Sequence, residues 1–221
     1  MYLTKTPFIL YRLYYPTGLW HVESADKDIY LTFDDGPVPE VTPWVLDQLE
    51  RYNAKATFFC VGDNVRKNPE IFAEIIRRGH NVGNHTFSHM NGWKANRLEY
   101  LHNVLKCKKH FETPLFRPPY GKISIIQRTL VKRYFKVVYW SVLSGDFDSS
   151  ITPQACLEKA ITSTEKGSIV VFHDSLKAQK NLCFALPAFL KHFHEKGYEF
   201  KVIPYDLFKS KKYTPATKQI S

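Results

Sequence analysis

Short apolar runs alternate with amphipathic stretches along most of this chain. The apolar runs are rich in β-branched and aromatic residues and end in turn residues, as buried strands do; they cover residues 29–33, 56–62, 81–84, 115–117, 136–142, 168–172 and 198–203. Between them, apolar residues recur at helical spacing over about 41–52, 69–78, 93–111, 123–134, 153–164 and 182–196. Seven strands alternating with helices predict parallel β/α units covered on both faces. The pattern indicates an α/β fold, and the strand count suits a barrel or near-barrel in a single domain.

Polar residues gather just after the predicted strands. They follow the first, third, fourth, fifth and sixth strands in turn: Asp34 and Asp35, His85 and His89, Arg117 and Tyr120, Asp146, and His173. In parallel β/α folds the carboxyl ends of the strands share one face, where active sites lie. Random placement would not favour one face so consistently, so the pattern predicts an active site there.

Two adjacent acids end the first predicted strand. The run 29–33 passes directly into Asp34 and Asp35, and Gly36-Pro37 then gives a strong turn signal. Carboxylates at the end of a core strand are costly unless a cation, a proton or water is close. An ordinary strand followed by an Asp-Gly turn is the alternative, and this stretch alone does not separate the two.

The histidines at positions 85 and 89 are four residues apart. If the segment turns helically, both imidazoles project from one face, as a metal site needs, although surface pairs at this spacing are common. Two neutral imidazoles and one carboxylate form a familiar divalent-metal site with a position left open for water. Either Asp34 or Asp35 could supply the carboxylate, and the other could take a proton from that water.

Composition limits the alternatives. The 221 residues are 44% hydrophobic and 15% aromatic, which excludes a disordered chain and allows a sizeable core. An excess of 31 Lys and Arg over 21 Asp and Glu gives a net charge of +10, which favours anionic polymers or membrane surfaces, or simply solubility. The sequence shows no arginine-rich arm or zinc-finger spacing that would indicate nucleic-acid binding. No stretch approaches the roughly 20 apolar residues of a transmembrane segment, and the oligomeric state is not determined.

The ends of the chain and its cysteines bear on domain limits and location. We expect residues 1–25 to form an N-terminal extension packed on a domain of residues 26–208, and residues 209–221 to form a basic mobile tail. The four cysteines include no close pair, which favours free thiols in a reducing compartment. The first residues lack the pattern of a secretory signal, so a cytoplasmic location is expected unless the chain is given without a leader.

Four segments, in order, resemble the motifs of the polysaccharide deacetylases, the NodB-homology family or carbohydrate esterase family 4. They read T-F-D-D-G-P at 32–37, H-T-F-S-H at 85–89, R-P-P-Y-G at 117–121 and V-F-H-D at 171–174. The resemblance spans about residues 26–205, and the first motif together with the histidine pair is specific. It implies an α/β fold of the distorted (β/α)7 barrel type, NodB-like and related to the TIM barrel, in agreement with the strand count.

The resemblance also implies a metal site and a base. Asp35, His85 and His89 would hold a divalent ion, zinc by preference, with cobalt or nickel as alternatives. Asp34 would be the general base, oriented by Arg117. The metal would activate a water for attack on an amide.

The remaining implied roles concern the oxyanion and the leaving group. The backbone N–H of Tyr120 would stabilise the oxyanion together with the metal, and His173 would protonate the leaving amine. An imidazole suits that task because its ordinary pKa lies near neutrality. Val171 stands where the family usually has the leucine that lines the acetyl pocket.

A further family motif, D-x-x-D-W, is matched only in part. Asp146 fits the aspartate that supports the acid histidine, while Asp148 is a competing partner two residues on. Leu143 replaces the first aspartate of the motif and Phe147 replaces its tryptophan. This wall of the site could therefore shape a substrate different from chitin or peptidoglycan.

The leading hypothesis is a metal-dependent hydrolase that removes N-acetyl groups from N-acetylated sugars, such as glycans containing N-acetylglucosamine. A variant keeps the chemistry but acts as a deformylase or deacylase on a small-molecule or lipid-linked amide. A hypothesis of another class is a non-catalytic carbohydrate-binding protein. Metal analysis together with acetate release from acetylated sugars would separate the two classes.

Overall fold

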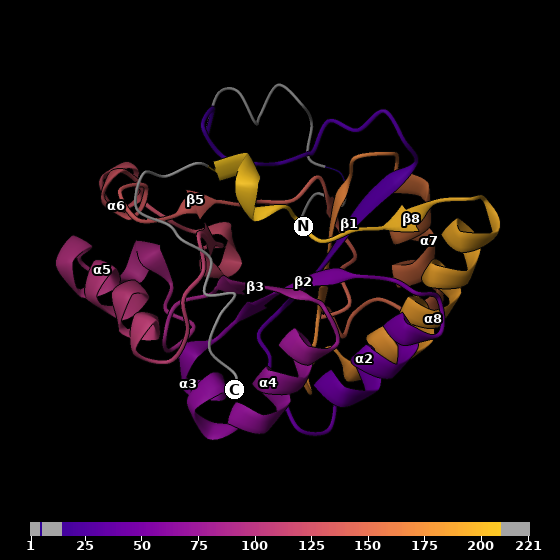
Figure 1. Ribbon diagram of the computed structural model, residues 1–221, viewed down its shortest axis with the longest axis horizontal. Coiled ribbons are helices and arrows are strands. Elements are labelled where there is room, and N and C mark those ends of the chain that lie inside the picture. Colours follow the sequence, from indigo (N-terminus) through magenta and orange to yellow (C-terminus); the bar gives the residue numbers. More distant parts are fainter. Residues whose placement is uncertain (1–4, 6–14, 209–221) are drawn as a thin grey trace.

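The computed structural model describes residue 5 and residues 15–208. A parallel sheet curls through the middle of the molecule, and the helices lie around its outside (Figure 1). Its strand order is β5-β4-β3-β2-β1-β7-β6, and β8 pairs with the start of β1. The strands are β1 Asp28–Asp34, β2 Ala56–Cys60, β3 Asn81–Asn84, β4 Leu115–Phe116, β5 Lys136–Val137, β6 Val142–Leu143, β7 Ile169–His173 and β8 Glu199–Phe200. The predicted α/β fold, a distorted barrel of parallel strands, is confirmed.

The helices follow the amphipathic stretches, with shifted ends. They are α2 Thr42–Glu50, α3 Gly62–Lys67, α4 Pro69–Arg77, α5 Arg97–Lys106, α6 Ile125–Val131, α7 Pro153–Ser163 and α8 Gln179–Glu195, with 3-10 turns η1 Gly92–Lys94, η2 Cys107–Lys109, η3 Pro119–Gly121 and η4 Tyr205–Phe208. Helix α5 starts where the Asn96 side chain caps it, well inside the predicted 93–111. Helix α3 was not predicted, because only Gly62 and Val65 of its six residues are buried and no apolar period marks it.

The prediction of a single strand at 136–142 is wrong. Its first part, β5, pairs with β4, and its second part, β6, pairs with β7 at the opposite end of the strand order. Four residues, 138–141, separate the two parts, so this segment joins the two edges of the sheet. No straight strand could pair with both β4 and β7 along its whole length, which explains the break.

The segment before β1 lies in this break. Leu19 N–H donates to the Val137 carbonyl, and Tyr139 N–H donates to the Leu19 carbonyl at 2.7 Å. Three residues on, Val22 N–H donates to the Gly167 carbonyl next to β7. Residues 15–22 therefore pack on the barrel, while residues 1–4 and 6–14 of the expected extension, and the expected tail 209–221, lie outside the described residues.

Alternation along β1 sends its side chains to two places. Ile29, Leu31 and Phe33 face the helices and join the main core, where the Phe33 ring stacks on Phe58 with centroids 5.0 Å apart. Full burial of such a side chain contributes about 1.5–3 kcal/mol. Because successive residues of a strand point to opposite faces, Thr32 and Asp34 point into the barrel. The fold thus places the Asp34 carboxylate inside the barrel, at the carboxyl end of β1.

Two further findings concern membranes and thiols. Among the described residues, no helix is long and apolar enough to cross a membrane. All four cysteines are free; Cys183 is exposed and the other three are buried.

Candidate metal and catalytic site

Unusual backbone conformations gather where the strands end. Asp35, Thr86, His89 and Tyr120 have φ between 54° and 86°, and among the described non-glycine residues only Asn53 shares this sign. Positive φ is uncommon for residues with a side chain, and such strain concentrates at functional sites. The turns after β1, β3 and β4 are therefore held by their surroundings rather than by local preference.

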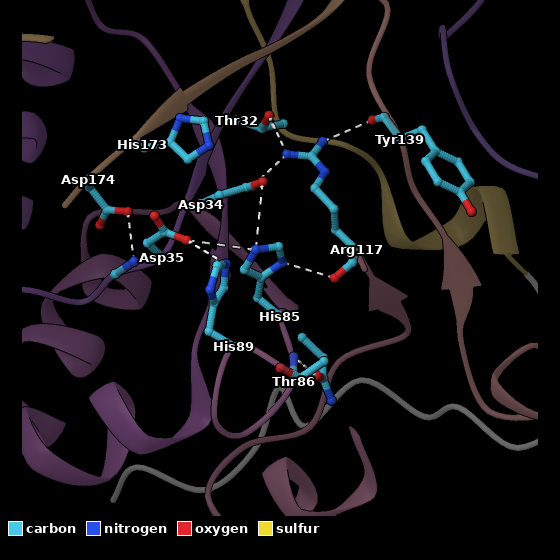
Figure 2. Close-up of polar contacts among 12 residues, drawn as sticks. Thr32, Asp34, Asp35, His85, Thr86, His89, Arg117, Tyr139, His173 and Asp174 are labelled. Atoms are coloured by element: carbon cyan, nitrogen blue, oxygen red, sulfur yellow. Dashed lines mark hydrogen bonds and ion pairs between the residues drawn. The ribbon is translucent and has the colours of Figure 1, made fainter. Parts of the chain in front are cut away.

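The three predicted metal ligands meet at one point. Asp35 Oδ1 lies 3.1 Å from His89 Nε2 and 3.8 Å from His85 Nε2, and the three atoms lie within 4.8 Å of one another (Figure 2). Asp35 Oδ1 is buried and accepts no hydrogen bond in the described part of the chain. A buried carboxylate oxygen without a donor, facing two imidazole nitrogens, fits a divalent cation.

The state of His85 suits a ligand. Its Nδ1–H donates to the Arg117 carbonyl at 2.9 Å, because a carbonyl can only accept, and this leaves the Nε2 lone pair facing Asp35. Burial lowers the pKa of His85 to about 4, so the ring is neutral near neutral pH. Burial alone would raise the pKa of Asp35, but His89, 3.1 Å away, and the positive charge of His173 outweigh it and hold that pKa well below its usual range.

The two histidines do not come together through a helical turn. The segment 85–90 is irregular, with left-handed Thr86 and His89. Side chains hold this loop: Thr86 Oγ1 accepts from Met90 N–H at 2.8 Å, and Asn103 Oδ1 accepts from Phe87 N–H at 2.9 Å. The helical turn predicted from the spacing is therefore wrong. The irregular loop nevertheless brings the same two rings together.

Asp34 faces the same point from inside the barrel. Arg117 Nη1 donates to Asp34 Oδ1 at 2.7 Å and to Thr32 Oγ1 at 2.8 Å, and its Nη2 donates to the Tyr139 carbonyl at 3.0 Å (Figure 2). The other carboxylate oxygen, Asp34 Oδ2, lies 3.9 Å from His85 Nε2. The guanidinium is fully buried, and its planar donors fix one carboxylate oxygen while the second remains turned toward the trio.

The third group is His173, at the end of β7. Its Nδ1 and its backbone N–H each lie 2.7 Å from one oxygen of the buried Asp146 carboxylate. Burial alone would lower the pKa of His173, but the charge and hydrogen bond of Asp146 outweigh it and raise that pKa to about 9. The structure decides between the two predicted partners of His173. Asp146 contacts the histidine, whereas the Asp148 carboxylate accepts from Ser150.

One pocket of about 770 Å³ joins these groups. Six predicted site residues line it: Asp34, Asp35, His85, His89, Tyr120 and His173. The other two, Arg117 and Asp146, are buried behind that lining and contact Asp34 and His173. All eight predicted residues are thus in one place, and the side chain of Tyr120 lies exposed at the mouth, with its ring 4.7 Å from that of His89.

Comparisons with known proteins identify the family of this chain. The family model for polysaccharide deacetylase matches residues 21–135, about half of the chain. The chain belongs to the polysaccharide deacetylase family. It is therefore a hydrolase of the kind that cleaves carbon–nitrogen bonds other than peptide bonds. Members of this family use a divalent metal, and the Asp35, His85 and His89 cluster is the candidate site for it.

Similar proteins include several deacetylases. A peptidoglycan-N-acetylglucosamine deacetylase of Bacillus cereus is 33% identical over 85% of this chain and 92% of its own length. A chitooligosaccharide deacetylase of Sinorhizobium fredii is 29% identical over 80% of this chain and 90% of its own. A solved structure of a peptidoglycan N-acetylglucosamine deacetylase, bound to an N-hydroxybenzamide compound, has a TM-score of 0.79 at 31% identity, covering 85% of this chain and 91% of that one.

Sequence reasoning gave no role to Asp174, which supports the turn beside the candidate metal site of this deacetylase. Its Oδ1 accepts from Gly36 N–H at 3.0 Å and its Oδ2 from the Thr42 hydroxyl at 2.6 Å. Burial raises the pKa of Asp174 to about 8. These bonds fix the turn that follows Asp35. The available signal was an acid directly after His173, which alternation along a strand turns away from the pocket.

The N-terminal wall of the pocket was also missed. Tyr15 and Trp20 both stack on Tyr139, with centroids 4.8 and 4.2 Å apart, and all three line the pocket. Tyr15 and Trp20 precede the part matched by the family model. Farther in, Leu143 and Val171 pair across neighbouring strands and form an apolar floor beside His173.

Proposed function

We propose that this deacetylase removes the acetyl group from N-acetylglucosamine residues of a glycan, with zinc as the metal. One observation carries the proposal: the two adjacent acids are divided between two jobs. Asp35 meets two histidines in a trio that could hold a metal, while Asp34 is held by Arg117 with one oxygen turned toward that trio. The names of the similar proteins support the acetylated sugar as substrate.

The chain's residues supply the proton transfers. A zinc ion held by Asp35, His85 and His89 would lower the pKa of a water and polarise the amide carbonyl. Asp34 accepts the proton from the attacking water, and Arg117 keeps the carboxylate oriented for that step. The backbone N–H of Tyr120 is the proposed donor to the developing oxyanion. His173, kept protonated by Asp146, donates its proton to the leaving amine, which is a poor leaving group without it.

The test measures acetate release and metal content together. In Asp34→Asn we expect kcat on N-acetylglucosamine oligomers to fall about 1,000-fold or more with zinc still bound, because proton transfer is lost and the trio is intact. The same change at Asp35 should remove the metal. Asp148→Asn is the matched control, since the Asp148 carboxylate accepts hydrogen bonds from Ser150, and it should keep both activity and metal. Full activity of Asp34→Asn would refute the assignment.

A second candidate keeps the chemistry and changes the substrate to a lipid-linked or small-molecule amide. The apolar lining by Tyr15, Trp20, Tyr139 and Leu143 favours it, because such side chains bind apolar groups better than hydrated sugar hydroxyls. Comparing kcat/KM for free oligomers with that for alkyl-linked N-acetylglucosamine distinguishes the two. A non-catalytic carbohydrate-binding protein would release acetate from neither.

A further inference from the structure

The positive charge of this chain is concentrated in one region. Residues 92–134 contain ten Lys and Arg against two Glu, a net +8 of the chain's +10. One of the ten, Arg117, is buried against Asp34 in the site. The rest of the chain is therefore close to neutral, and most of the positive charge lies between the start of η1 and residue 134, just after α6.

The same region carries most of the exposed large apolar side chains. Nine are exposed among the described residues, and six of them lie here: Trp93, Leu98, Tyr120, Ile125, Ile126 and Tyr134. Ile125 is 70% exposed and Trp93 is 66% exposed, so these are protruding side chains rather than edges of the core. Soluble proteins seldom gather such residues in one place unless they bind something.

Hydrogen bonds hold η1 and the start of α6 together as one surface. The Gln127 amide donates to the carbonyls of Gly92 and Ala95 at 2.8 and 3.0 Å, and Gly92 N–H donates to the Lys122 carbonyl. Helices α5 and α6 pack on each other and lie together at one edge of the molecule (Figure 1). We call the exposed side chains of residues 92–98 and 120–134 the basic apolar face. These hydrogen bonds connect its two segments.

Lysines accompany the aromatic rings of this face. Lys122 Nζ lies 5.2 Å from the centroid of the Trp93 ring, and Lys108 Nζ lies 5.9 Å from that of Tyr134. Aromatic and aliphatic side chains beside lysines are the combination that seats a protein in the headgroup region of an anionic bilayer. Basic residues near such a surface add electrostatic attraction to its anionic headgroups.

We propose that the basic apolar face docks on an anionic lipid bilayer and that the catalytic pocket takes N-acetylated sugars linked to lipids in that bilayer. Two residues connect the face to the site: Tyr120 stands at the pocket mouth, and Lys122 both lines the pocket and lies over Trp93. A soluble anionic polymer would interact only with the positive charges of this face, and it would leave the Ile125 and Ile126 side chains in water. The protruding apolar side chains favour the bilayer.

The first test is co-sedimentation with phosphatidylcholine vesicles, with and without phosphatidylglycerol. We expect binding only to the anionic vesicles, and a loss of about tenfold or more in the partition coefficient for Ile125→Ser/Ile126→Ser, because two inserted side chains are lost. Ile76→Ser/Phe184→Ser removes two exposed large apolar side chains from α4 and α8 and should bind as the unchanged protein does. If the first double variant fails to fold, Trp93→Ser tests the same face.

Three outcomes would overturn the proposal. One is no binding of the unchanged protein to anionic vesicles at low salt. Another is equal loss in both double variants, which would indicate a nonspecific effect. The third is salt-sensitive binding that Ile125→Ser/Ile126→Ser leaves unchanged, which would indicate a site for soluble polyanions.

The substrate part rests on the proposed function and has its own readout. With alkyl-linked N-acetylglucosamine embedded in vesicles, we expect deacetylation by the unchanged protein to be about tenfold faster on anionic than on neutral vesicles. Ile125→Ser/Ile126→Ser should lose this ratio but keep its rate on soluble oligomers. Failure on every acetylated sugar would refute the proposed function, whereas normal activity on oligomers without the vesicle ratio would refute only this inference.

Discussion

Strand β3 has a buried histidine near each end, and only one of them belongs to the site. His80 precedes the strand and His85 follows it, and burial lowers the pKa of each to about 4. At the amino end, Ala56 N–H donates to His80 Nδ1 at 3.2 Å, and the His80 ring packs edge-on against Phe58. At the carboxyl end, His85 Nδ1–H donates to the Arg117 carbonyl.

The two rings are therefore opposite tautomers. His80 uses its Nδ1 lone pair on a backbone N–H, whereas His85 keeps its Nε2 lone pair for the point shared by Asp34 and Asp35. Residue type, burial and the direction of the pKa shift are the same at both ends. The backbone group that each ring meets decides which ring has a nitrogen free to bind a metal, and that group is set by the neighbouring strand.

The largest expected difference between the two histidines is in metal binding. His85→Gln should lose the metal and lower kcat about 1,000-fold or more, because one of three ligands is removed. His80→Gln should keep the metal content and stay within a few-fold of normal kcat. Elemental analysis and acetate release on both variants check this. A His80 variant that also lost its metal would break the comparison.

Arg117 sharpens the comparison, because its carbonyl sets the His85 tautomer while its side chain orients Asp34. In Arg117→Lys the carbonyl remains, but a single ammonium cannot reach Asp34, Thr32 and the Tyr139 carbonyl together. We expect normal metal content, a kcat about 100-fold lower, and an unfolding free energy reduced by about 3 kcal/mol. Loss of the metal here would mean that the side chain, rather than the carbonyl, orders the trio.

His80 should contribute to the way the free energy of unfolding changes as the pH falls. Its pKa is lowered from 6.5 to about 4 in the folded state. The unfolded chain therefore binds a proton first as the pH falls, so stability is lost between about pH 6.5 and 4, by up to about 3 kcal/mol. In His80→Gln this loss should be smaller by the contribution of His80, while His85, whose pKa is also lowered to about 4, keeps its own contribution. Lost packing also lowers the stability of the variant at pH 7. Urea unfolding at several pH values measures the pH-dependent loss, and an unchanged pH slope in the variant would contradict the assignment.

The smallest expected effect concerns Asp174, which braces the turn after Asp35. Thr42→Val keeps the shape but removes the donor to Asp174 and the acceptor of Val38 N–H, which should cost about 2 kcal/mol of unfolding free energy. Thr162→Val is the matched control, because that exposed hydroxyl bonds only within its own helix. It should change stability by less than about 0.5 kcal/mol. Equal losses in both would show that the buried bond adds nothing.

Much of the fold was predictable because its signals are local. Apolar runs and helical spacing gave the parallel α/β barrel, and polar residues at strand ends gave the face that carries the site. Helix α3 and the split of residues 136–142 could not be predicted in this way. The first has too few buried residues to show a period, and the second depends on which strands lie on either side.

For the site, the sequence alone determined that Asp34, Asp35, His85 and His89 lie near one another, and the family motifs predicted a division of work between the two acids. Only the tertiary structure decided how they are held. The choice of Asp146 over Asp148 depends on the distance between two segments 27 residues apart. The tautomer of His85 depends on the carbonyl of Arg117, the residue after β4. The turn after Asp35 depends on Asp174. Such bonds join strand ends that are distant in sequence, so no local pattern could encode them.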